Sequence, residues 1–393
     1  MASTDAEKAL QDAPVVPVFS ADEAKQEVEM KLDLEATSFS AQNAYFLAKM
    51  CKIAYETPDE VKGFLETNGF WGSGVSAGKM FEWFEASDEV ASATTFDAIH
   101  DTEAFVAAND DAVIVTFRGS KGRRDWLTNL SILLRSIPEN WKVHVPDGGL
   151  HLGFDDGVNT VWMPGPGHPE GMVAVIKEFL NAGGKTRKLY VTGHSLGAAL
   201  ATVAMARLTF VENMNVAAMY TMGGPKVFDT DVADLFDAKD NYGTALKDKC
   251  FRCRNNNDIV PRVPPFPYKH VGHEIYFDRF GAISTTSFVD RILGRFSALL
   301  RFSVIDGIND HGRTEYVRLL EQAVISSRIS LVAKATSVVV DVAQKVLHVN
   351  EDAAKEQEEE VLAAKEAALE ASTAEDVFVP DADSVPEHLV GAE

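Results

Sequence analysis

The pentapeptide Gly193-His194-Ser195-Leu196-Gly197 carries the clearest chemical signal in the sequence. It stands between an apolar strand-like run, KLYVT, and a small-residue helical run, LGAALATVAMARL. A serine at such a turn takes a strained backbone conformation, and the flanking glycines let strand and helix approach each other. The turn would expose the Ser195 hydroxyl as a nucleophile, and the N–H of Leu196 could stabilise an oxyanion. The alternative is a glycine-rich turn whose serine only caps the helix.

A serine nucleophile needs a base, and the base needs an orienting carboxylate. In folds with this kind of turn the chain order is serine, acid, histidine. His311, within DGINDHGRTEYV, precedes a helical run in the type of loop that presents a base, whereas His348 and His388 fall in the terminal helix and tail. For the acid, Asp258 follows a strand-like run and precedes the turn-rich segment IVPRVPP. Three acids after the preceding strand remain rivals, namely Asp229, Asp231 and Asp234.

Alternating strand-like and helical runs surround these residues. Apolar residues three and four positions apart predict a helix over 39–55, and Pro58 opens a second one over 58–66. The strand-like runs are KMFEWFEA, TTFDAIHD, EAFVAAND, AVIVTFRG, KLYVTGHS, AAMYTMGG and KCFRCRNNND. The fourth is continuously apolar and suits a buried central strand. We therefore expect an α/β fold with a mostly parallel central sheet and helices on both faces.

The net charge is concentrated at the two ends of the 393-residue chain. Of the formal −22, residues 1–35 carry −6 from nine acids and three bases, and residues 351–393 carry −12 from fourteen acids and two bases. This predicts acidic, disordered tails around a nearly balanced body. Because 46% of the residues are hydrophobic, the body has globular composition, and the acidic excess argues against nucleic acid as a partner.

Cysteine usage and the chain start bear on the compartment. The three cysteines, Cys51, Cys250 and Cys253, are too few for a disulfide scaffold and indicate a reducing environment. The N-terminus lacks the basic start and apolar stretch of a signal peptide, and its acids argue against a transit peptide. Because no uncharged apolar run reaches 18 residues, we expect a cytoplasmic protein without a membrane span.

Several linked motifs around the serine turn resemble the class 3 lipases, a family of filamentous-fungal triacylglycerol lipases, plant acylhydrolases and diacylglycerol lipases. The matching stretches are VTFRGS (115–120), DWLTNL (125–130), VH (143–144), HLGF (151–154), VTGHSLGAALA (191–201), GPKV (224–227), NDIVPRVPP (257–265) and DH (310–311). They run in family order across about residues 40–320. Together they are far more specific than the serine turn alone.

The resemblance implies an α/β-hydrolase with Ser195 as nucleophile, Asp258 as acid and His311 as base, and with Ser120 and Leu196 as the oxyanion hole. It further implies a serine lipase or carboxylester hydrolase that cleaves acyl esters of glycerolipids through an acyl-enzyme, without cofactor or metal. The expected partners are a lipid ester substrate and, peripherally, a membrane or lipid-droplet surface. Two alternatives stay open: an esterase for soluble feruloyl or short acyl esters, and a catalytically silent lipid-binding protein.

We expect the hydrolase domain to span 36–325, followed by a helical extension over 326–350. Two stretches, 121–137 and 287–305, combine apolar side chains with arginines, and either could act as a lid or contact lipid. The alternative for both is a helix packed on the core with solvated arginines.

Two stretches depart from the family motifs, and one group of residues imitates a metal site. Phe228 replaces a small residue of the family motif, which we expect to reshape the pocket, and the run NTVWMPGPGHPEG (159–171) is expected to form an added surface loop. Cys250 and Cys253, with His270 and His273, imitate a zinc pattern. Because positions three apart in a strand face opposite sides, we expect no metal there.

Overall fold

The computed structural model describes residues 28–72, 75–76, 78, 80–86, 102–120, 134–142, 145, 147–165, 169–238, 242–256, 258–278, 281–284 and 311–328. The chain divides into two compact units, Glu29–Val324 and a second made of Met1–Val28 with Ile325–Glu393. Nearly all of the described residues belong to Glu29–Val324. The expected strand at 94–101, the stretches 121–133 and 287–305 and the C-terminal tail lie outside them. The domain boundaries at 36, 325 and 350 stay a prediction.

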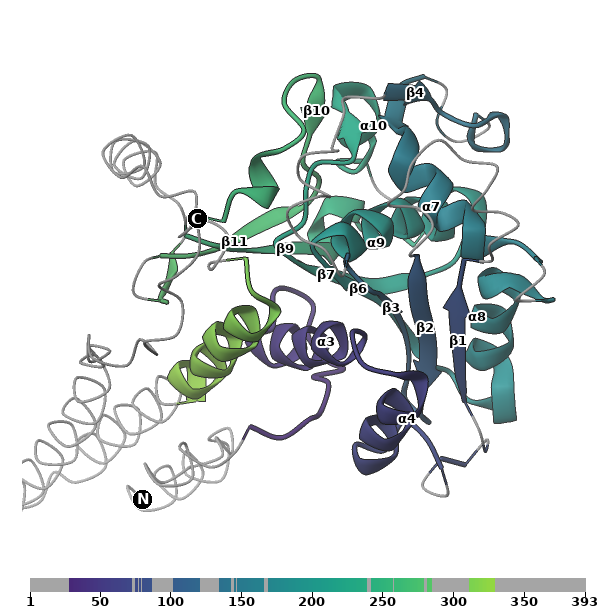
Figure 1. The fold of residues 1–393 in the computed structure, drawn as a ribbon, viewed down its shortest axis with the longest axis vertical. Coiled ribbons are helices and arrows are strands. Elements are labelled where there is room, and N and C mark those ends of the chain that lie inside the picture. Colours follow the sequence, from purple (N-terminus) through teal and green to yellow (C-terminus); the bar gives the residue numbers. More distant parts are fainter. Residues whose placement is uncertain are drawn as a thin grey trace, which may run out of the picture. The chain divides into compact units, whose positions relative to one another are not determined.

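An eight-stranded sheet lies at the centre of this unit, in the order β1-β2-β3-β6-β7-β9-β11-β12 (Figure 1). Its strands are β1 (Phe81–Glu85), β2 (Glu103–Ala108), β3 (Ala112–Phe117), β6 (Lys188–His194), β7 (Val216–Met222), β9 (Cys250–Asn255), β11 (His273–Phe277) and β12 (Ile283–Ser284). Neighbours from β3 to β11 pair in parallel. The strands β1, β2 and β12 join at the edges in antiparallel. The expected mostly parallel central sheet is thereby confirmed.

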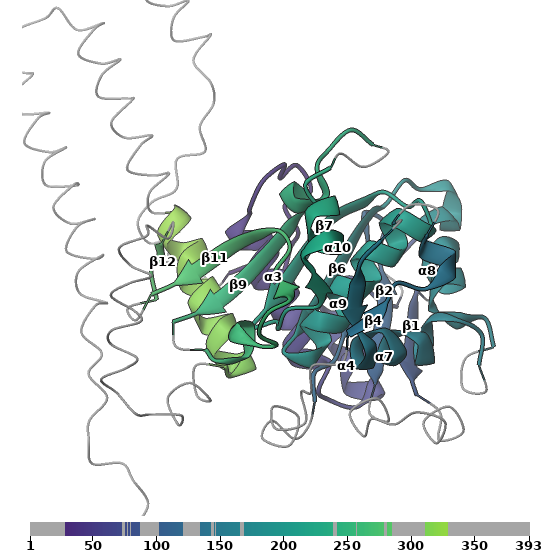
Figure 2. The ribbon, with the colours of Figure 1, turned by 90° about the horizontal axis from the view of Figure 1, so that it is seen from above.

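Helices cover both faces of the sheet (Figure 2). The helices α3 (Ala41–Ile53) and α9 (Leu196–Ala206) both contact β3, β6 and β7, which two helices can do only from opposite faces. All eleven residues of α9 are buried, because α7 (Leu152–Trp162) covers the side that the sheet does not. The helix α8 (Gly171–Asn181) packs on β2 and β3. None of the described helices is long and apolar enough to cross a bilayer.

Local capping explains where the first two helices begin. The Ser40 hydroxyl accepts the N–H of Asn43 and so caps α3. Thr57 and Glu60 form a reciprocal capping box around Pro58, the first residue of α4 (Pro58–Thr67). The helices expected over 39–55 and 58–66 are therefore both confirmed.

A second, four-stranded antiparallel sheet was not expected from the sequence. Its order is β10 (Tyr268–Lys269), β8 (Phe228–Asp229), β5 (Gly149–His151) and β4 (Leu134–Ser136). Strands of two or three residues are too short to show a period of two. Phe228 is fully buried in β8, with its ring centroid 5.7 Å from that of Phe236, so it packs in the core.

The expectation of an added surface loop at 159–171 is partly wrong. The first four residues continue α7, and Val161 and Trp162 are buried in the core. Only 163–170 connect α7 to α8, because the apolar residues of NTVW fall on the inner face of the helix.

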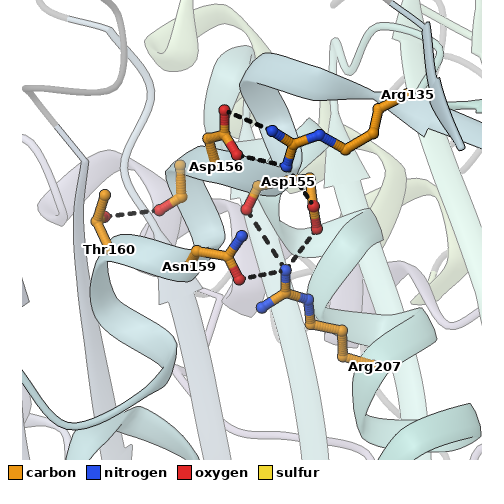
Figure 3. A network of polar contacts seen from close by, with 7 residues as sticks. Arg135, Asp155, Asp156, Asn159, Thr160 and Arg207 are labelled. Atoms are coloured by element: carbon orange, nitrogen blue, oxygen red, sulfur yellow. Dashed lines mark hydrogen bonds and ion pairs between the residues drawn. The ribbon is translucent and has the colours of Figure 1, made fainter. Parts of the chain in front are cut away.

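A buried ion pair joins α7 to the end of α9 (Figure 3). The Arg207 guanidinium donates to Asp155 at 2.5 Å and to Asn159 at 2.7 Å, and Asp155 is 1% exposed. Arg135 of β4 reaches the same carboxylate at 3.2 Å and Asp156 at 2.6 Å. Burial lowers the pKa of Arg207, and the charge of Asp155 opposes that shift. The network therefore ties the small sheet, α7 and α9 together through one carboxylate.

Candidate active site

Ser195 occupies the turn between β6 and α9 in a backbone conformation that few non-glycine residues adopt, with φ 60° and ψ −124°. A side chain on Gly193 would overlap the carbonyl of Gly197, and a side chain on Gly197 would overlap the carbonyl of Phe117. Both glycines are therefore required for the helix to start directly above the strand. The turn places the serine hydroxyl at the carboxyl end of the central parallel strands.

Asp258 and His311 meet Ser195 from two other parts of the chain. The Nε2 atom of His311 lies 2.7 Å from Ser195 Oγ, and its Nδ1 lies 2.9 and 3.0 Å from the two carboxylate oxygens of Asp258. The exposed fractions are 6% for Ser195, 3% for His311 and zero for Asp258. Because a carboxylate only accepts, Nδ1 carries the proton, and Nε2 is left to accept the serine hydroxyl. This arrangement suits proton abstraction from Ser195.

Two further donors surround the Asp258 carboxylate. The N–H of Val260 donates to Oδ1 at 2.9 Å, and the hydroxyl of Tyr316 donates to Oδ2 at 2.6 Å. Burial and the negative charge of Asp258 raise the pKa of Tyr316 well above its usual value, so the hydroxyl stays protonated. The carboxylate is buried but fully hydrogen-bonded, which is the condition for keeping a charge in the interior.

Gly223, directly after β7, allows the acid and the base to meet there. Its φ is 60°, and an added Cβ would lie 2.6 Å from Asp258 Oδ2 and 2.9 Å from the His311 ring. Sequence reasoning missed both Gly223 and Tyr316. Gly223 was visible only as part of the motif around Pro225, and Tyr316 had no signal beyond its place in the helical run after His311.

The rival acids have other roles in the described structure. Asp229 caps α10 (Thr230–Leu235) by accepting the N–H of Val232 at 3.0 Å. Asp234 pairs with Lys269, and Asp231 is exposed in the first turn of α10. The structure therefore brings Asp258, and none of these three, to His311.

The other histidines that follow Ser195 have different partners where they are described. His270 donates from Nε2 to the carbonyl of Pro261 at 2.6 Å, and His273 pairs with Asp248 at 2.9 Å. His348 and His388 lie outside the described residues.

The two candidate oxyanion donors lie on neighbouring strand ends. Leu196 is the first residue of α9, where no carbonyl within the helix can accept its N–H. Ser120 is half-buried just after β3, whose Phe117 pairs with Gly193 of β6. A Cβ on Gly119 would lie 3.3 Å from that of Ser195, so the residue before Ser120 lies close to the nucleophile.

The cysteines imitating a zinc pattern lie in β9 as buried thiols. Burial raises the pKa of Cys250 and of Cys253, which disfavours the thiolate that zinc requires. Within the described part of the chain, no group of three or more His, Cys, Asp or Glu side chains is placed to hold a metal ion.

Comparison with known proteins found similar sequences among the lipases. The family model "Lipase (class 3)" matches residues 114–268. The lipase of Rhizomucor miehei is 31% identical over 185 residues, which cover 45% of this chain and 46% of that protein. The secreted mono- and diacylglycerol lipase 1 of Fusarium solani is 33% identical over 179 residues, covering 44% of this chain and 46% of that protein. The solved triacylglyceride lipase of Rhizomucor miehei aligns with a TM-score of 0.45 at 22% identity, over 70% of this chain and 94% of that one.

The parallel sheet, its helices on both faces and the serine turn define the α/β-hydrolase fold. The family match is more specific: over residues 114–268 the chain is similar to the class 3 lipases. It spans less than half the length of the two curated relatives described above.

Proposed function

We propose that this protein is a serine carboxylester hydrolase that cleaves acyl esters of glycerolipids. The observation that carries the proposal is the hydrogen bond of 2.7 Å between Ser195 Oγ and His311 Nε2, with Asp258 on the opposite ring nitrogen. The lipid substrate is supported by the relatives, which are called lipases and mono- and diacylglycerol lipases.

In the proposed reaction, Ser195 Oγ attacks the ester carbonyl carbon while its proton moves to His311 Nε2. Asp258 orients His311 and stabilises the imidazolium that forms. The N–H of Leu196 and the main-chain N–H and hydroxyl of Ser120 stabilise the oxyanion, at roughly 3 kcal/mol for one donor. The alcohol leaves with the proton from His311, and an acyl-enzyme remains. Water then attacks the acyl carbon with His311 as base, which releases the fatty acid and restores Ser195.

The location and lipid contact are part of the same proposal. Cys51, Cys250 and Cys253 are free thiols, which fits a reducing compartment, so we propose a cytoplasmic protein. Its substrate would come from a membrane or lipid-droplet surface, with which the protein makes peripheral contact. Fractionation of cells into cytosol, membranes and droplets would test this location.

Replacement of the nucleophile tests the proposal directly. Ser195→Ala should lower turnover of p-nitrophenyl esters by roughly 10⁴-fold or more and abolish labelling by a fluorophosphonate probe. Ser38→Ala, at an exposed position before helix α3, is the matched control and should retain both. Undiminished hydrolysis by Ser195→Ala would contradict the assignment.

Substrate series separate the proposal from its alternatives. Rates measured from acetate to oleate esters, below and above substrate aggregation, should rise with the lipid aggregate if the protein is a lipase. Activity confined to soluble short esters would indicate an esterase instead. Liposome association without fluorophosphonate labelling would indicate a silent lipid-binding protein.

A further inference from the structure

Tyr55 and His194 form a hydrogen-bonded pair directly behind the Ser195–His311 contact. The Nε2 atom of His194 lies 2.8 Å from the main-chain oxygen of His311, and its Nδ1 lies 3.0 Å from the hydroxyl of Tyr55. The rings of His194 and His311 are stacked, with centroids 4.8 Å apart and planes inclined by 30°. His194 is 2% exposed, so it takes part in a buried array and not in a surface contact.

The hydrogen-bond partners determine the tautomer of His194. A main-chain carbonyl can only accept, so the Nε2 atom of His194 must carry a proton to bond the oxygen of His311. In the neutral imidazole the Nδ1 atom is then an acceptor, and the Tyr55 hydroxyl is the donor that it requires. The Tyr55 hydroxyl therefore favours the one neutral tautomer that can hold His311.

Tyr55 itself contacts two further residues of the site, Arg313 and Gly119. The guanidinium carbon of Arg313 lies 4.2 Å from the centre of the Tyr55 ring, close enough for a cation–π contact. A Cβ on Gly119 would overlap the Tyr55 hydroxyl and would lie 2.5 Å from the carbonyl of His194. The hydroxyl thus packs where the segment before Ser120 meets the serine turn.

We propose that Tyr55 and His194 are positioning residues for His311. Tyr55 holds His194 in the Nε2–H tautomer, and His194 holds the carbonyl of His311 so that its ring stays aligned with Ser195. This alignment matters because His311 lies outside the strands, just before the helix that begins at residue 313. A displacement of about 1 Å at a reacting group can cost roughly 100-fold in rate. The inference rests on the proposed hydrolase function.

The first test removes one hydroxyl. Tyr55→Phe keeps the ring under Arg313 but withdraws the donor to His194. We expect kcat for p-nitrophenyl butyrate to fall about 3- to 10-fold with KM within two-fold, as for lost alignment without lost substrate binding. The matched control is Tyr45→Phe. It removes a hydroxyl of helix α3 that is hydrogen-bonded to Glu321, and it should leave kcat and KM unchanged.

A second test uses a side chain that has no tautomers. His194→Gln retains an N–H donor of similar reach and should keep more activity than His194→Phe, which has none. In the His194→Gln background, Tyr55→Phe should cost less than two-fold, because no tautomer is left to be selected. An equal cost of Tyr55→Phe in both backgrounds would overturn the proposal.

Nitrogen-15 NMR of the histidines gives a readout that simple destabilisation would not change. Wild-type His194 should show the Nε2–H tautomer, and Tyr55→Phe should shift it towards Nδ1–H. An Nδ1–H tautomer in the wild type overturns the inference. The inference is also overturned if the wild type is active and labelled by the probe but Tyr55→Phe has the same kcat as Tyr45→Phe. Absence of fluorophosphonate labelling in the wild type would instead remove the proposed function, and the inference with it.

Discussion

Tyr316 donates a hydrogen bond of 2.6 Å to Oδ2 of Asp258, and the same hydroxyl accepts the N–H of Asn255 at 3.0 Å. One buried phenol, on the helix that follows His311, thus connects the candidate acid to the end of strand β9. Burial and the charge of Asp258 raise the pKa of Tyr316, so the hydroxyl stays protonated beside the carboxylate.

Tyr316→Phe should weaken both catalysis and stability. The change withdraws one donor from Asp258 and leaves the buried N–H of Asn255 without this acceptor, which costs about 1–3 kcal/mol. We expect kcat for a soluble ester to fall about 3- to 10-fold and the free energy of unfolding in urea to fall by that amount. If kcat stays at the wild-type value, the hydrogen bonds from Val260 N–H and His311 suffice to orient Asp258, and this prediction is wrong.

Gly223→Ala adds a single methyl group but should strongly reduce activity. The added Cβ would press on Asp258 Oδ2 and on the His311 ring, so we expect kcat to fall at least about 100-fold. Gly69→Ala is a matched control, because Gly69 also has a positive φ, of 74°, but open space around its Cβ. Backbone strain should cost both variants about 1–2 kcal/mol of stability, and the overlap with Asp258 and His311 should add to this loss in Gly223→Ala. Only Gly223→Ala should lose activity. Equal activity in the two would contradict the packing at Gly223.

The buried Asp155–Arg207 pair should be far more costly to break than an exposed one. Asp155→Leu leaves the guanidinium buried without its main counter-charge, and we expect a loss of about 3–5 kcal/mol in urea unfolding. Asp155→Leu combined with Arg207→Met should recover part of that loss, since no unpaired charge remains. Lys62→Met, which breaks the exposed pair with Asp59, should stay within about 0.5 kcal/mol. A double variant no more stable than Asp155→Leu alone would argue against this account.

His270 should make the fold less stable in mild acid. Burial, together with the charge of Arg252, lowers the pKa of His270 well below 6.5. Below about pH 6.5 the imidazole is therefore protonated in the unfolded chain but stays neutral in the folded one. The stability present above pH 6.5 is lost as the pH falls towards the pKa of the folded state. The melting temperature of the wild type should drop between pH 7.5 and 5.5 more steeply than that of His270→Gln. Parallel curves would assign the acid sensitivity to other groups.

Local features of the chain were predictable from the sequence because their causes lie within a few residues. The turn at Ser195 needs only a strand, two glycines and a helix in succession. Positions 193 and 197 must be glycine because any side chain there would overlap the neighbouring backbone. The same holds for α4, where Thr57 and Glu60 cap a helix that opens at Pro58. The parallel sheet followed from the alternation of strand-like and helical runs.

Contacts between distant residues were decided only by the tertiary structure. The residues alone left Asp258 among several candidate acids, and the hydrogen bonds to His311 distinguish it from Asp229, Asp231 and Asp234. Tyr316 lies 58 residues from Asp258, and Tyr55 lies 139 residues from His194. No local spacing encodes such pairs, because packing of helices on the sheet brings them together. The sequence by itself thus determined the nucleophile turn and the layers that carry it, whereas the folded chain decided which side chains surround the acid and the base.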